Sequence, residues 1–76
     1  MNRIRRKKLQ ALVEKILEIK DELESIKDEE EEYRDNMPEN LQGSERYERA
    51  DEACDSLDSA VSSLEDVLSY IEEATE

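Results

Sequence analysis

Apolar residues recur along the first half of the chain in alternating steps of three and four. The series is Leu9, Leu12, Ile16, Ile19, Leu23, Ile26, Tyr33 and Met37, with Glu30 as its one polar member. The same rhythm resumes later as Tyr47, Ala50, Cys54, Leu57, Val61, Leu64, Leu68 and Ile71. Such steps define a heptad repeat whose apolar residues take positions a and d of an α-helix. The pattern therefore predicts two amphipathic helices, with Leu9 and Tyr47 each at position a.

The residues between the two series favour a loop. Pro38 disfavours the helical conformation at Met37, Gly43 permits a positive φ, and Ser44 is a suitable N-cap. We expect one domain over residues 1–76, with a helix at 3–36, a loop at 37–43 and a helix at 44–75. Because the connection is short, the two helices must run antiparallel. The expected fold is an all-α, coiled-coil-like hairpin.

One register of this hairpin pairs residues whose numbers sum to about 80. The resulting layers are Tyr33 with Tyr47, Ile26 with Cys54, Leu23 with Leu57, Ile19 with Val61, Ile16 with Leu64, Leu12 with Leu68, and Leu9 with Ile71. The same register brings opposite charges together at position e, namely Arg6 with Glu72, Lys20 with Asp58, and Lys27 with Asp51. A register one heptad longer preserves the apolar seam as well, so both remain open.

Position g of the second helix carries a further column of small apolar residues. The column is Ala53, Ala60, Val67 and Ala74. A short hairpin buries little surface, and small residues allow another helix to approach closely. We therefore expect a homodimer that forms a four-helix bundle through this face. The alternative is that the alanines are present only as good helix formers.

The charge balance limits the classes of partner. The chain has 23 Asp and Glu against 11 Lys and Arg, a formal net charge of −12, and no His. Such a charge opposes direct binding to nucleic acid or to an anionic membrane and favours a basic protein partner. No apolar stretch is long enough to span a bilayer. With one cysteine and no apolar secretory signal at the start, we expect a cytoplasmic protein.

The acidic residues do not form a recognisable chemical site. The run from Asp28 to Asp35 lacks the spacing of a calcium loop, and without His there is no zinc set and no nucleophile–His pair. We therefore expect no catalytic, cofactor-binding or metal site. Glu29 with Glu32, and Asp51 with Asp55, only loosely imitate the acidic elements of helical magnesium-dependent nucleotide pyrophosphatases, which remain an alternative.

Residues 50–76 contain no Lys or Arg, so five carboxylates in this stretch are expected to lack counterions within the second helix. The candidate partner-binding residues are Asp51, Asp55, Asp58, Glu65 and Asp66. The leading interpretation is that these residues form an acidic face that binds a basic protein partner. One alternative is a DNA mimic of the phage-inhibitor type, because rows of carboxylates can imitate a phosphate backbone. The other is a general contribution to solubility.

The first residues of the chain carry the opposite charge. The basic cluster is Arg3, Arg5, Arg6, Lys7 and Lys8. In an antiparallel hairpin it is expected beside Glu72, Glu73 and Glu76, while contact with nucleic acid is the alternative.

The segment DNMPENLQGSERYE, with flanking acidic helices ending in SLEDVLSYIEEA, resembles a group of small proteins from Gram-positive bacteria and their phages and mobile elements. The likeness extends over nearly the whole chain, and its specific part is Asn36 to Glu48. The resemblance implies a cytoplasmic or phage-related setting. It carries over no functional residue, but it draws attention to the loop. There Met37 and Leu41 are expected to dock onto the helices, with docking onto a partner as the alternative.

Overall fold

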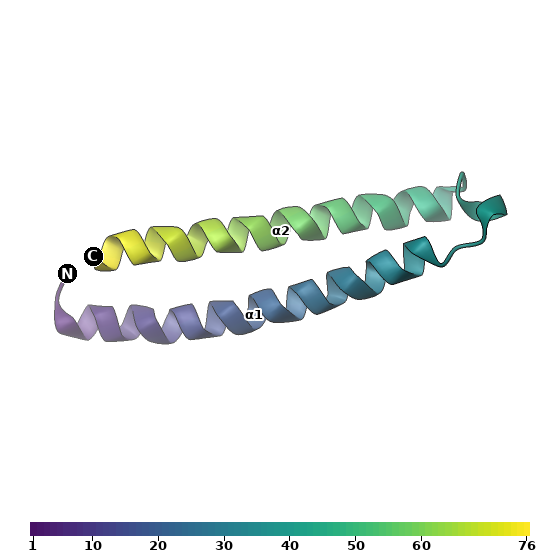
Figure 1. Ribbon diagram of the computed structural model, residues 1–76. Helices are drawn as coiled ribbons and strands as arrows, with labels where there is room; N and C mark the ends of the chain where they lie inside the picture. The colour runs from purple at the N-terminus through teal and green to yellow at the C-terminus, as the bar shows by residue number, and fades with distance from the viewer.

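A computed structural model describes all residues, 1–76, as two long helices folded back on each other (Figure 1). Helix α1 spans Arg3–Asp35 and helix α2 spans Glu45–Thr75, and a short 3-10 helix, η1, spans Glu39–Leu41 between them. The molecule is a rod of 59 × 15 × 13 Å without a β-strand. The all-helical hairpin expected from the heptads is therefore present.

Side-chain caps explain where the helices begin. The Asn2 carboxamide oxygen accepts a hydrogen bond from the Arg5 amide at 2.8 Å, and the Ser44 hydroxyl accepts one from the Tyr47 amide at 3.3 Å. Each cap satisfies one of the backbone N–H groups left free in a first helical turn. The predicted Ser44 cap is thus confirmed, and both helices begin and end within one residue of the expected positions.

The connection differs from a simple turn. Asn36 caps the end of α1, Pro38 precedes η1, and the Met37 side chain is buried with 8% of its surface exposed. Met37 thus docks onto the helices as expected, whereas Leu41 is 38% exposed. Gly43 does not use the positive φ that a glycine permits, because no residue of the chain has one.

Three ion pairs between the helices determine their register. Lys20 pairs with Glu65 at 3.5 Å, Lys27 with Asp58 at 3.1 Å, and Arg34 with Asp51 at 2.9 Å. The two residue numbers of each pair sum to 85. This sum is seven, or one heptad, larger than that of the e-position pairs in the shorter register.

The shorter register is therefore wrong, and so are the layers that it implied. In the observed register, the start of α1 extends beyond the end of α2 (Figure 1). The basic cluster was expected beside Glu72, Glu73 and Glu76. None of its five residues forms an ion pair with them or with any other residue.

Helix α1 is also rotated relative to the expected seam. Its part-buried residues occupy positions a and e, with Glu24 and Glu31 at position b, whereas the predicted d column is half exposed. The exposed fractions of that column are 47% for Leu12, 49% for Ile19, 51% for Ile26 and 48% for Tyr33. The column that replaces it toward α2 is Val13, Lys20, Lys27 and Arg34. The long stems of the basic residues can cover apolar surface while their charges reach the carboxylates.

Helix α2 faces α1 as the heptads predicted. Ala50, Cys54 and Val61 are buried, and Leu57, Leu64 and Leu68 are part-buried. Cys54 does not lie beside Ile26, as the shorter register required, but near Glu30, Glu31 and Arg34, whose charges act on its thiol.

The core between the helices is small. Only Met37, Ala50, Cys54 and Val61 are buried, and the chain exposes 5954 Å². A compact monomer of 8.9 kDa exposes about 4,800 Å². The isolated hairpin thus leaves about 1,100 Å² more surface in water than a compact fold of its mass.

The register can be tested by exchanging charges across the hairpin. Lys27→Glu should lower the free energy of unfolding by about 1 kcal/mol or less, because it removes an exposed pair and brings like charges together. Adding Asp58→Lys should restore most of that loss, as measured by urea unfolding followed by circular dichroism at one protein concentration. Adding Asp51→Lys instead is the matched control and should not restore it. Rescue by Asp51→Lys and not by Asp58→Lys would support the shorter register.

Candidate functional site

One long edge of the hairpin consists of alternating charges. This charged edge contains Lys20, Lys27, Arg34, Asp51, Asp58 and Glu65. The hydrogen bond from Lys27 to Asp58 raises the pKa of the Lys27 ammonium group, although desolvation opposes this. Hydrogen bonding to Asp35 is the largest cause that raises the pKa of Arg34, and Asp51 adds to it. These basic groups stay protonated and hold carboxylates of α2.

The charged edge includes some of the candidate partner-binding residues but not all of them. Asp51, Asp58 and Glu65 already have counterions, which α1 provides rather than α2. Asp55 and Asp66 are exposed and take part in no ion pair. Of the predicted acidic face, these two carboxylates are the ones without an internal partner.

The opposite edge of the hairpin is apolar. On a helix, positions d and g lie on the side of the seam away from position e, so the d column of α1 and the g column of α2 share this edge. We call the following set the apolar edge: Leu12, Ile19, Ile26 and Tyr33 of α1, and Ala53, Ala60, Val67 and Ala74 of α2. Ala53 and Ala60 are part-buried, whereas Ala74 is exposed and Val67 is 41% exposed.

The α1 half of the apolar edge was missed because its residues were assigned to the hairpin core. The basic residues at position e were a possible signal, since their stems can occupy the seam in place of the d column. The apolar edge is therefore wider than the column of small residues in α2.

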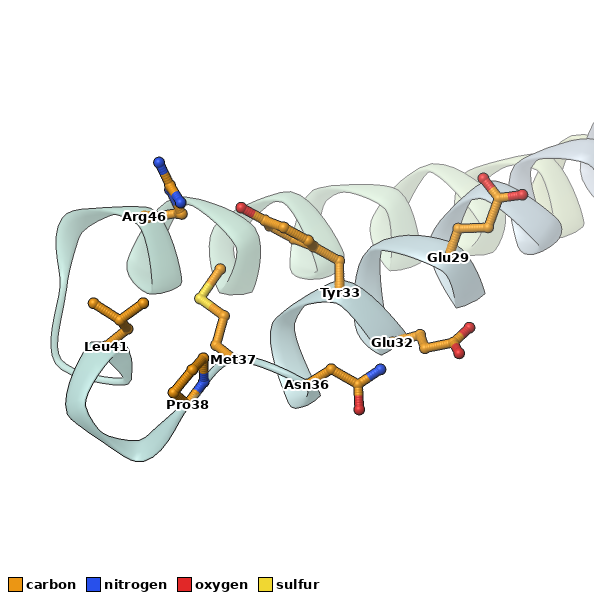
Figure 2. A pocket seen from close by; sticks show the side chains of 8 residues that line it. All are labelled: Glu29, Glu32, Tyr33, Asn36, Met37, Pro38, Leu41 and Arg46. Carbon is orange, nitrogen blue, oxygen red and sulfur yellow. The ribbon is translucent and has the colours of Figure 1, made fainter.

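An open depression of about 500 Å³ lies at the loop end of the apolar edge. Figure 2 shows Tyr33 and Met37 extending toward α2. The depression is lined by Glu29, Glu32, Tyr33, Asn36, Met37, Pro38, Leu41 and Arg46. Its charged lining residues are the carboxylates of Glu29 and Glu32 and the guanidinium of Arg46.

A smaller depression of about 260 Å³ lies at the other end of the rod, where the chain termini meet. Leu9, Val13, Leu17, Leu68 and Ile71 provide its apolar lining. Glu72 is its one charged lining residue, and it contains no basic group.

Helix α1 carries basic residues near its start and acidic residues near its end. None of the residues of the basic cluster, and none of Asp28 to Glu32, forms an ion pair within the chain. The basic cluster and this acidic segment lie near opposite ends of one helix, which prevents them from neutralising each other within the hairpin.

No group of three acidic or cysteine side chains is placed to hold a metal ion. Of the acidic pairs compared with nucleotide pyrophosphatases, Glu29 and Glu32 border the loop-end depression, while Asp51 is held by Arg34. No helix is long and apolar enough to cross a membrane.

Comparisons of the chain with protein-family models, with curated proteins and with solved structures found no match. The surface of the hairpin is therefore the basis for the functional proposal.

Cys54 provides a test of the seam of α2. Burial raises the pKa of its thiol, and the neighbouring Glu31 and Glu30 add to this while Arg34 opposes it. A raised pKa and a buried position both reduce the reactive thiolate. Labelling by a thiol reagent at mildly alkaline pH should be at least about tenfold slower than in the urea-unfolded chain, because each 1.4 kcal/mol of opening free energy corresponds to about tenfold protection. Equal rates in the two states would contradict the placement of Cys54.

Proposed function

We propose that the chain is a non-catalytic helical interaction module that assembles as a homodimer and presents an acidic face to a basic protein partner. The observation that carries the proposal is the division of the hairpin into two unlike edges. The apolar edge supplies a surface for association, and carboxylates of α2 remain exposed outside it.

The acidic face is centred on Asp55 and Asp66, which have no counterion within the chain. Asp51, Asp58 and Glu65 adjoin them and contribute less, because Arg34, Lys27 and Lys20 screen their charges. An unpaired carboxylate can bind a partner's cation without first losing an internal ion pair. Binding should therefore depend most on the unpaired residues.

A phage-type DNA mimic is the second candidate. The observation that favours it is the series of exposed carboxylates along a rigid rod. A mimic would bind a nucleic-acid-binding enzyme and release it as salt rises, because such contacts depend on counterions. The resemblance to proteins of phages and mobile elements is compatible with this role.

The acidic face can be tested with a lysine homopolymer as a defined cationic probe. Asp55→Asn with Asp66→Asn should weaken binding several-fold at low salt and reduce its salt dependence, because fewer ionic contacts remain. Isothermal titration at several salt concentrations measures both effects.

The matched control is Glu14→Gln with Asp21→Asn, which removes the same charge from exposed positions f of α1. This control should bind the polymer more like the parent. Equal weakening in both double variants would show that only net charge matters and would contradict a specific acidic face. Magnesium-dependent release of pyrophosphate from nucleoside triphosphates would contradict the non-catalytic assignment.

A further inference from the structure

The charges next to the apolar edge change sign at the middle of α1. Position g of this helix carries Lys8 and Lys15 in its first half and Glu22 and Glu29 in its second half. These residues border the exposed d column, whose central member, Ile19, is the midpoint of Arg3–Asp35. The border of the apolar edge is therefore complementary to itself when the helix direction is reversed.

We propose that the apolar edge binds a second copy of this chain, with the two α1 helices antiparallel about a two-fold axis at Ile19. This inference rests on the homodimer of the proposed function and specifies its geometry. The reversed copy places its Glu29 opposite Lys8 and its Glu22 opposite Lys15, and symmetry repeats both pairs. A parallel pair of α1 helices would instead oppose Lys8 to Lys8 and Glu22 to Glu22, which is unfavourable.

The apolar side chains match in the same arrangement. Ile19 meets Ile19 of the second copy, and Leu12 meets Ile26 on either side of the axis. Because Lys20 pairs with Glu65, the level of Ile19 along the rod is close to that of Val67 in α2. Val67 then faces Val67 of the second copy, and Ala60 faces Ala74. The small residues predicted for the dimer face thus lie at the same interface, except Ala53, which extends past the end of the partner's α2.

The ends of α1 are also complementary. The basic cluster lies beyond the end of α2 and forms no ion pair, and the acidic segment from Asp28 to Glu32 is equally unpaired. Antiparallel pairing brings Arg5 and Lys8 of each basic cluster to the acidic segment of the other copy. Arg5 then lies at the level of Tyr33, which lines the loop-end depression together with Glu29 and Glu32.

The excess exposed surface of the hairpin is comparable to the surface that a standard protein interface buries. The hairpin exposes about 1,100 Å² more than a compact chain of its mass, and standard interfaces bury about 800 Å² on each partner. Pairing of the two apolar edges would therefore bring the assembly close to the surface of a compact protein.

Single cysteines can test the symmetry in a Cys54→Ala background, under glutathione redox exchange. Ile19→Cys should link to itself and give a covalent dimer. Leu12→Cys alone and Ile26→Cys alone should remain unlinked, whereas a mixture of the two should form the mixed disulfide. Self-linking by both Leu12→Cys and Ile26→Cys would show parallel pairing, and an unlinked Ile19→Cys would place the interface elsewhere. Either result would overturn the inference.

A charge exchange provides a second test that leaves the apolar residues intact. Lys8→Glu should weaken dimerisation about tenfold in sedimentation equilibrium, because two symmetric ion pairs are lost and like charges are brought together. Adding Glu29→Lys should restore the dimer. Lys7→Glu changes the same charge at position f, outside the interface, and is the control. An equal effect of Lys7→Glu and Lys8→Glu would contradict the geometry.

The mass of the unmodified protein in solution shows whether the homodimer exists, independently of how the two copies pair. A dimer that fails the cysteine and charge tests would overturn the α1 pairing and leave the homodimer in place. A monomer at all concentrations would overturn both the pairing and the homodimer, while the lysine-polymer test of the acidic face would stand by itself. A monomer that binds a double-stranded oligonucleotide through Lys7 and Lys8 would assign the basic cluster to nucleic acid instead.

Discussion

The ion pairs of Lys20, Lys27 and Arg34 with carboxylates of α2 determine both the register and the rotation of α1. Each pair is worth little in water. Registers that differ by one heptad present almost the same apolar seam, however, so small electrostatic differences can decide between them. Because the basic residues occupy the seam edge beside α2, the large apolar side chains of position d turn outward. The half-exposed position of Ile19 and Ile26 is a direct consequence of this arrangement.

The sequence predicted what depends on local chemistry. Periodicity located both helices, Ser44 marked the start of the second, and the residues around Pro38 marked the loop. It did not select the register, because each alternative offers three ion pairs at position e. The shorter one uses Arg6 with Glu72, and the longer one replaces this pair by Arg34 with Asp51. Counting the possible pairs therefore does not select the register, which follows from the pairs that form, at 3.5, 3.1 and 2.9 Å.

The candidate surfaces were predictable to a similar extent. The excess of acidic residues in α2 was evident from the sequence, but their counterions became visible only when α1 was placed beside them. Asp58 belongs to an ion pair, whereas Asp55, three residues earlier, does not. The apolar edge was half anticipated through Ala60 and Val67. Its α1 half was missed because Ile19 and Ile26 satisfy the rule for a hairpin core equally well.

The central claim is that a hairpin with so little buried surface gains stability from a second copy. Unfolding followed by circular dichroism over about a hundredfold range of protein concentration tests this most directly, because dimer formation couples stability to concentration. The account predicts that the midpoint temperature rises with concentration and that helicity falls when the chain is dilute. A constant midpoint with full helicity over the whole range would show that the hairpin is stable by itself and would contradict the claim.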